Sequence, residues 1–425
     1  MLHSVHSHLA HHSSSVLGLA LSILAFSSGA AAQELPEEEE RWSPPNETEF
    51  SVVPFVGGSS DTGFGGGYIA SLARLRQDRE PYVYRIDTTA SVTFDESRDG
   101  GLRLPYADVF LRWRFPHVIA NRLGVELRAS YTRETNLGYY GLGNGSALPP
   151  GLERGDPFFE YSRVHPTLKM SWDLQLKPLY FSWGASYTGN WLNVPPDTLL
   201  ATDFESEQPY VRDLVGNARQ HSVPQFSLGV AWDTRDDDVA PVRGAYLSAE
   251  LALTPGTFGE AWYRFGRSTS TARLYLPLVP QRRRLVLATR LVADFLVGNA
   301  PFYELARYDE TSAIGGSRGV RGVPAQRYYG KIKLLANLEL RAELLELRIF
   351  GTKRRFGLVA FADTGRVWAD YAARPELDRT DLGLAYGLGG GLRVASGKTF
   401  MLRFDLAWSP GSRSTSGYLL AGHMF

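Results

Sequence analysis

Cysteine is absent from the 425 residues of the chain. Its absence excludes disulfide bonds, iron–sulfur clusters and catalysis by a thiol. An excess of charge of either sign is also missing, because 45 Lys and Arg residues balance 45 Asp and Glu residues. A formal net charge of zero gives no long-range attraction to nucleic acid, so we expect no nucleic-acid partner.

Long apolar runs are scarce. The run from Val16 to Phe26 is too short to cross a bilayer as a helix, which takes about 20 apolar residues. It is followed by Ala30-Ala31-Ala32 before Gln33, and small residues at that distance are typical of a signal-peptide cleavage site. We therefore predict that residues 1–32 are an export signal. With a mean hydropathy of −0.20, the chain is also far less apolar than a helical membrane protein.

Residues 33–48 are acidic, contain three prolines and show no apolar periodicity. Segments of this composition do not bury enough apolar surface to fold alone. We expect a short linker here.

From Phe50 onward, apolar and polar residues alternate with a period of two, as in residues 109–115, 125–132 and 400–408. This period indicates strands with one apolar face, and the opposite face often carries full charges. A soluble β-sandwich would turn the apolar face inward. A membrane barrel turns it outward to lipid and directs the charges into a wet lumen.

Length and the last residue favour the barrel. Residues 50–425, divided at roughly 24 residues per strand and loop, give about 16 strands, an even number as in bacterial barrels. Closure removes the unpaired sheet edge that lipid cannot hydrate. The sequence also ends on Phe425, as many outer-membrane barrels do. We predict an all-β, antiparallel transmembrane barrel over residues 49–425.

A glycine-arginine stretch at residues 315–323 contains Arg318 and Arg321. Two later stretches, residues 337–341 and 361–368, accompany it. Together the three resemble the signature of the Omp85 superfamily, which includes the bacterial surface antigen D15 and the BamA/TamA-type barrels of the outer membrane. Members of that family insert or translocate other proteins.

The resemblance implies that the loop at 315–323 folds into the barrel and pairs its arginine with wall carboxylates. Arg321 matches that arginine, and Glu339 and Asp363 match its acidic partners. The loop glycines of the motif are Gly315, Gly316 and Gly322. An aromatic residue is usual where Val323 stands. About eleven strand candidates precede the loop and about five follow it, as in the family, and residues 232–244 resemble a further family hairpin.

The resemblance also directs attention to the seam between the first and last strands. Pro54, in the first candidate strand, has no N–H to give to a ladder. Gly417 and Gly422 lie in the last candidate strand, residues 416–425. A seam with few hydrogen bonds can open sideways, as the lateral gate of the family does. These three residues can equally shape a barrel corner, so both interpretations stay open.

A lipid hydrolase and a passive pore or scaffold are the two alternative functions. A lipid hydrolase needs a serine and a histidine in a catalytic arrangement, and none of the four histidines beyond the signal lies in a nucleophile motif: His117, His165, His221 and His423. A passive pore or scaffold for a partner protein remains an alternative, although an inward loop argues against a wide channel. We expect no enzyme activity, no metal and no cofactor.

The resemblance implies a protein of the Gram-negative outer membrane, in contact with outer-membrane lipids, that assembles or translocates client barrel proteins or moves lipids. Most relatives carry periplasmic POTRA domains before the barrel, and residues 33–48 leave no room for one. We therefore expect an accessory periplasmic protein or lipoprotein to gather the clients.

Overall fold

The computed structural model describes residues 47–76, 79–96, 100–119, 122–146, 151–152, 155–279, 285–308, 313–349, 352–396, 400–412 and 414–425. The predicted export signal at 1–32 and nearly all of the predicted linker lie outside these ranges. The described part starts just before the first strand, which begins at Thr48, one residue before the predicted start of the barrel.

Strands make up most of the described chain. They are β1 (Thr48–Ser59), β2 (Gly63–Arg76), β3 (Arg79–Glu96), β4 (Leu102–Ile119), β5 (Leu123–Gly138), β6 (Glu160–Leu176), β7 (Leu179–Asn193), β8 (Gln220–Asp233), β9 (Gly244–Thr254), β10 (Phe258–Gly259), β11 (Arg264–Pro277), β12 (Leu285–Asn299), β13 (Ile332–Ile349), β14 (Thr352–Trp368), β15 (Ala385–Ser396), β16 (Phe400–Ser409) and β17 (Ser414–Ala421). The short helices are η1 (Pro157–Phe159), α2 (Leu199–Phe204), α3 (Pro209–Val215), α4 (Phe302–Ala306) and α5 (Pro375–Asp378).

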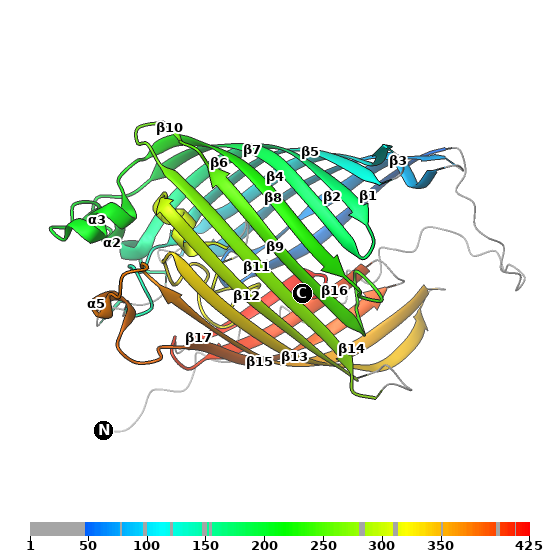
Figure 1. Ribbon diagram of the computed structural model, residues 1–425. Coiled ribbons are helices and arrows are strands. Elements are labelled where there is room, and N and C mark those ends of the chain that lie inside the picture. The colour runs from blue at the N-terminus through cyan, green and yellow to red at the C-terminus, as the bar shows by residue number, and fades with distance from the viewer. Residues whose placement is uncertain are drawn as a thin grey trace, which may run out of the picture.

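The strands form one closed antiparallel barrel (Figure 1). Sixteen long strands of the described chain build the wall, each paired with its neighbours, and the two-residue β10 adds a short pairing to β8. Eleven of the long strands precede the loop that carries Arg321 and five follow it. The predicted fold and strand number are confirmed.

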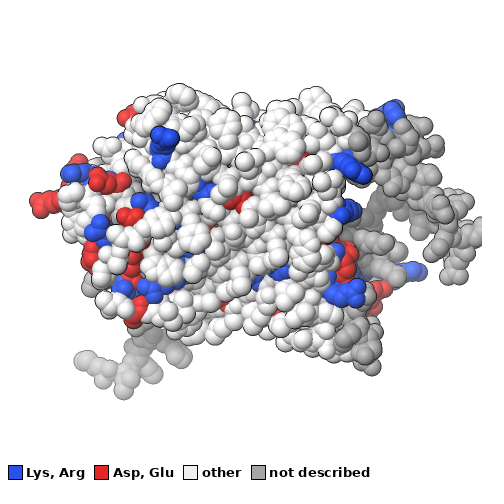
Figure 2. Space-filling model, viewed as in Figure 1, with Lys and Arg blue, Asp and Glu red and all other residues white. Residues whose placement is uncertain are grey.

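The wall has the inverted polarity of a membrane barrel. Large apolar side chains on its outer face are exposed, among them Leu111, Leu228, Leu251, Leu338 and Leu406. Charged side chains turn inward and are buried, including Asp87, Arg163, Asp294, Glu339 and Asp405. Figure 2 shows the result: charged atoms gather at the two ends of the barrel, and the wall between them is largely uncharged. The outer face therefore fits lipid and the inner face fits water.

The two ends of the barrel differ. At one end the connections are mostly tight, as at Lys177 and Pro178 between β6 and β7. At the other end lie the long segments 194–219, 300–331 and 369–384, with the short helices α2, α3 and α5 (Figure 1). Short turns face the periplasm and long loops face outside in barrels of this kind. None of the described helices has the length and apolar character needed to cross a membrane.

The strand β13 contains an irregular stretch of the sequence, where Leu344 and Leu345 break the alternation of apolar and polar residues. The structure has a strand there, with a bulge between Glu343 and Leu345 in its pairing to β14. The bulge accommodates the extra residue and explains the broken alternation.

Reversing the polarity of the wall at one outward position should destabilise the barrel. Leu228, in the middle of β8, is 62% exposed. We expect Leu228→Arg to lower the free energy of unfolding in lipid by roughly 2–4 kcal/mol, because the charge faces the bilayer midplane. Ser227→Arg is the matched control, since its neighbour Ser227 lines the internal cavity. Urea titration in liposomes should separate the two, and equal losses would contradict the assigned faces.

Candidate functional site: the inward loop and the strand seam

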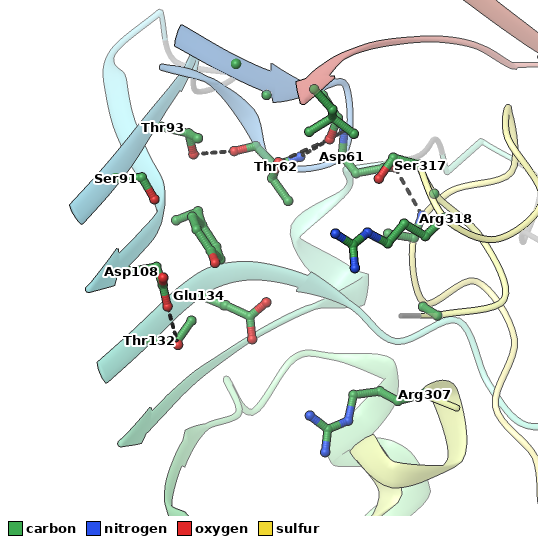
Figure 3. A pocket seen from close by; sticks show the side chains of 18 of the residues that line it. Asp61, Thr62, Ser91, Thr93, Asp108, Thr132, Glu134, Arg307, Ser317 and Arg318 are labelled. Atoms are coloured by element: carbon green, nitrogen blue, oxygen red, sulfur yellow. Dashed lines mark hydrogen bonds between the residues drawn. The ribbon is translucent and has the colours of Figure 1, made fainter. Parts of the chain in front are cut away.

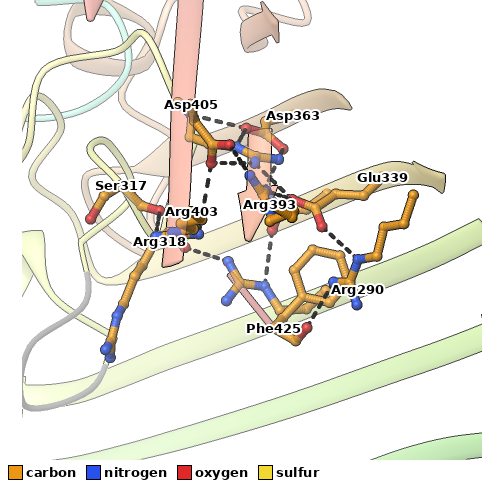
Figure 4. A network of polar contacts seen from close by, with 12 residues as sticks. Arg290, Ser317, Arg318, Glu339, Asp363, Arg393, Arg403, Asp405 and Phe425 are labelled. Atoms are coloured by element: carbon orange, nitrogen blue, oxygen red, sulfur yellow. Dashed lines mark hydrogen bonds and ion pairs between the residues drawn. The ribbon is translucent and has the colours of Figure 1, made fainter. Parts of the chain in front are cut away.

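The connection between β12 and β13 folds into the lumen and buries Arg321 completely, at 0% exposure. Its Nε donates to Asp363 Oδ2 at 2.7 Å and its Nη2 to Asp363 Oδ1 at 3.0 Å, which makes a bidentate pair. Its Nη1 donates to Glu339 Oε1 at 2.7 Å. Arg321 therefore lies between the two carboxylates named from the sequence. Figure 4 shows these carboxylates, Glu339 from β13 and Asp363 from β14. Two parallel N–H···O bonds fix the orientation of a guanidinium as well as its position.

Two further wall residues contact Arg321 and were not identified from the sequence. Asp405, on β16, accepts a hydrogen bond from Nη1 at 3.2 Å. The guanidinium carbon lies 3.4 Å from the ring centroid of Phe361, on β14. The alternation of residues along the strands places both side chains on the lumen face. Asp405 lies on the charged face of residues 400–408, and Phe361 shares the face of Asp363, two residues away.

The cluster around Arg321 is a network of ion pairs with several arginines. Arg341 Nε donates to Glu339 Oε2 at 2.8 Å. Arg393 Nη1 donates to Asp405 Oδ1 at 2.6 Å. Three buried carboxylates are therefore shared among neighbouring guanidinium groups, and Arg321, Arg341 and Arg393 each face a carboxylate. A buried charge whose partner is removed becomes very costly.

Backbone groups of the loop are also hydrogen-bonded to the wall. The N–H of Arg321 also donates to Asp363, at 3.1 Å, and Asn337 Nδ2 donates to the carbonyl of Gly319 at 2.9 Å. The N–H of Gly322 donates to the hydroxyl oxygen of Tyr418, on β17, at 3.0 Å. The loop is thus fastened to the strands on its side of the lumen, including the last one.

The loop glycines meet specific geometric demands. A Cβ on Gly315 would lie 1.8 Å from the carbonyl oxygen of Pro324. Gly316 and Gly322 have φ values of +80° and +89°, which residues other than glycine rarely adopt. Val323, in place of the usual aromatic residue, is fully buried in an apolar cluster with Ile314, Val320, Leu335 and Val367.

Arg318, the other arginine of the loop, is placed differently. Its carbonyl accepts hydrogen bonds from Tyr308 Oη, at 2.9 Å, and from Arg290 Nη2. Its side chain points into the internal cavity (Figure 3). The two arginines of the motif therefore lie in different places: Arg321 is bonded into the wall, and Arg318 contributes to the lining of the cavity.

Among the sixteen long strands of the described chain, β1 and β17 share the shortest pairing. β1 pairs with β2 along its whole length, from Thr48 to Ser59. With β17, pairing within the described chain is limited to Gly58 with Leu419 and Ser59 with Tyr418, extended by Ser60 N–H to the carbonyl of Gly417 at 3.1 Å. Among the described residues, a long stretch of β1 that includes Pro54 therefore has no pairing partner on its seam side.

The predicted seam residues occupy different places. Gly417 lies at the paired end of the seam, and Pro54 in the unpaired part of β1. Gly422 lies beyond β17, which ends at Ala421 and is shorter than predicted. With φ at +80°, Gly422 turns the chain off the strand. A Cβ on Gly57 would lie 2.9 Å from the carbonyl oxygen of Leu419, so β1 and β17 approach each other closely at this position.

A cavity of about 2890 Å³ fills the lumen that the loop leaves free. Its polar lining includes Asp108, Glu134, Arg307 and Arg318 (Figure 3). The lining also passes along β1 at the seam and reaches Leu392, Val394, Leu402 and Phe404. By the alternation of β15 and β16 these four share the outer face with the exposed Leu406, so the cavity extends from the lumen to the lipid side through the seam.

The histidines are engaged in contacts unlike those of a catalytic serine and histidine. His165 Nε2 lies 3.0 Å from Glu134 Oε2, and His221 Nε2 lies 2.7 Å from Tyr303 Oη. His423 follows β17 at the end of the chain. The side chain of His117 lies outside the described part. The absence of an enzyme activity stays a prediction.

Comparison with known proteins gives a family match over more than half of the chain. The sequence model of the Omp85 superfamily domain matches residues 181–417. That range contains Arg321 and all three carboxylates around it. No curated protein sequence matches the chain significantly.

Two solved structures share the fold. BamA from Haemophilus ducreyi lacking POTRA domains 1–3 superposes with a TM-score of 0.58 at 15% identity, covering 96% of this chain and 78% of that one. CdiB from Escherichia coli superposes with a TM-score of 0.51 at 14% identity, covering 91% of this chain and 64% of that one. The present chain therefore spans less than two thirds of the CdiB chain.

Proposed function

Because the chain belongs to the Omp85 superfamily of outer-membrane barrels, we propose that it inserts or translocates client proteins by opening its wall between β1 and β17. The family supports a general role in insertion or translocation at the outer membrane, and the route through the seam is our proposal. The observation that carries it is the short pairing between these two strands.

An unpaired strand edge in lipid is unfavourable, because no water is present to satisfy its N–H and C=O groups. The edge of β1 below Gly58 is such an edge. It offers backbone donors and acceptors to an incoming strand, which gains hydrogen bonds by adding to the sheet. An extended segment of a client is therefore a suitable partner for this edge.

The cavity supports the same route, because it joins the lumen to the outer face at the seam. A client segment entering there would have polar walls on one side and lipid on the other. The inward loop is bonded to β13, β14 and β16, and also to β17 at Tyr418. We infer that the loop stiffens this part of the wall while β1 moves.

Client barrels, outer-membrane lipids and an accessory periplasmic protein or lipoprotein are the proposed partners. No nucleotide or other cofactor is proposed, since folding and burial of the client in lipid release free energy. Affinity purification from gently solubilised membranes should recover an accessory protein together with the barrel. Recovery of the barrel alone, with an unchanged outer-membrane protein profile after deletion, would count against a role in assembly.

Locking the seam should abolish activity. The chain has no cysteine, so Ser60→Cys with Gly417→Cys introduces a single disulfide where Gly417 N–H meets Ser60 Oγ at 2.9 Å. A Cβ on Gly417 makes only ordinary contact, 3.7 Å from Leu406. We expect the oxidised variant to lose at least about tenfold in the rate at which it folds a client barrel into liposomes, and reductant to restore it. Tenfold corresponds to about 1.4 kcal/mol in the barrier.

The matched control joins β6 to β7, where Thr167 and Thr188 are paired with their hydroxyl oxygens 3.0 Å apart. Thr167→Cys with Thr188→Cys adds the same chemistry to a continuous part of the wall and should leave the rate unchanged. A locked seam with full activity would rule out the route through it. Steady large currents in planar bilayers from the same locked variant would favour the passive pore.

A further inference from the structure

The chain leaves the wall after β17 and turns into the lumen. The N–H of Gly422 donates to the carbonyl of Met401, at 2.8 Å, and its φ of +80° redirects the backbone. In Figure 1 the C-terminal end of the chain lies inside the barrel outline, between β16 and β12. A final strand that simply continued would place Phe425 in the wall, whereas here Met424 and Phe425 are each only 6% exposed.

Phe425 fills a defined site on the far wall. Its carbonyl oxygen accepts a hydrogen bond from Arg341 Nη2 at 2.8 Å. Its ring centroid lies 5.1 Å from the guanidinium carbon of Arg341, 5.3 Å from that of Arg290 and 6.5 Å from the ring of Tyr275. Val286 and Ala288 of β12 complete the apolar part. The two guanidinium groups attract the face of an aromatic ring. The neighbouring ring of Tyr275 also favours an aromatic side chain at this position.

The same site is joined to the loop network. Arg341 binds Phe425 through Nη2 and Glu339 through Nε, and Glu339 in turn accepts from Arg321. The segment after β17 is therefore connected, through two side chains, to the arginine that fixes the inward loop (Figure 4). Tyr418 of β17 makes a second connection to the loop, at Gly322.

We propose that Tyr275, Val286, Ala288, Arg290 and Arg341 form a binding site for an aromatic residue, and that the chain's own Phe425 occupies it and fastens β17 from the lumen side. The fastening matters because β17 has little pairing with β1. β17 pairs with β16 from Ser414 to Ala421 on one edge. On its other edge, toward β1, contacts made in the lumen have to supply most of the stabilisation. The site stands independently of whether the barrel inserts proteins.

Cross-linking tests the occupancy in the whole protein. Met424→Cys with Val286→Cys joins two residues of one apolar cluster. We expect a disulfide to form readily in isolated outer membranes. Met424→Cys with Ser227→Cys, whose second position lines the cavity on β8, should not cross-link. A reversed pattern, or no cross-link in either variant, would overturn the placement of the segment.

Seam mobility tests the fastening. Leu419→Cys provides a thiol at the paired end of the seam, and its rate of reaction with a maleimide reports how often β17 separates. Adding Phe425→Ala should raise that rate at least about tenfold, while Phe425→Trp should keep it close to the parent value. Equal rates for Ala and Trp would show that the ring does not fasten the strand.

A peptide tests the chemistry of the site. A variant lacking residues 423–425 should bind a fluorescent Gly-His-Met-Phe peptide, and the full chain, whose site is filled, should bind it at least about tenfold more weakly. Arg341→Ala in the shortened variant should abolish the difference. Equal binding to the full and shortened chains would overturn the site, and if the shortened chain does not fold, the cross-linking result decides.

Discussion

Arg321→Ala is expected to expel the inward loop and to destabilise the barrel by about 3–5 kcal/mol, the usual effect of removing one partner of a buried ion pair. The side chain makes hydrogen bonds to Glu339, Asp363 and Asp405, all fully or almost fully buried. Its loss leaves these carboxylates short of a counter-charge in a site that water does not reach. It also removes the cation that lies over Phe361.

Two measurements should report the change. Heat-shifted mobility on a gel gives the melting of the barrel, and limited proteolysis reports cleavage within residues 313–331 once the loop leaves the lumen. Arg318→Ala is the matched control, because that side chain faces the cavity rather than the wall cluster. It should leave both readouts near the parent values. Unchanged protease protection in Arg321→Ala would mean that the loop is held by its backbone and apolar contacts alone.

Arg321→Lys should recover only part of the loss. A lysine keeps the charge, but it lacks the planar guanidinium group that meets both oxygens of Asp363. An intermediate melting temperature would therefore separate the contribution of charge from that of geometry.

The sequence shows which face of the wall a residue occupies, but it does not show the position of that residue along the barrel axis. Alternation assigns Glu339, Asp363 and Asp405 to the lumen face, and the family resemblance pairs the first two with Arg321. Neither the alternation nor the resemblance shows that Asp405, 84 residues after Arg321, lies at the same position along the barrel axis as Glu339 and Asp363. That position depends on the stagger between β13 and β16, which is set by the pairings of the two strands between them. The stagger between β13 and β16 is the sum of the stagger at each strand pairing between them, so a pattern within one strand does not determine it.

The end of the chain shows a second limit. A terminal phenylalanine is typical of outer-membrane barrels, and the alternation at 416–421 continues toward it. The turn at Gly422 and the cations of Arg290 and Arg341, both on distant strands, take Phe425 into the lumen instead. The residues that bind Phe425 come from β11, β12 and β13, so the sequence of the last ten residues does not reveal this site.

Gly387→Ala is expected to reproduce the phenotype of Arg321→Ala without changing any charge. Gly387 lies on β15 beneath the loop, and a Cβ there would lie 1.8 Å from the carbonyl oxygen of Arg321. Contacts under 3.0 Å to a backbone atom are not relieved by a rotamer change, so either the loop or the strand must move. The strand is held by β14 and β16 on its two edges. We therefore expect the loop to leave, with increased cleavage at residues 313–331 and a lower melting temperature.

Gly390→Ala, three residues along the same strand, is the matched control. A Cβ at that position lies 3.4 Å from the carbonyl oxygen of Val359, which is close to ordinary contact, and the substitution should leave loop and barrel intact. Combining Gly387→Ala with Arg321→Ala should then add little to either change alone, because both act by removing the same docked loop. Additive losses would show instead that the alanine distorts β15 itself, and that the close approach of loop and strand is not what holds Arg321 against the wall.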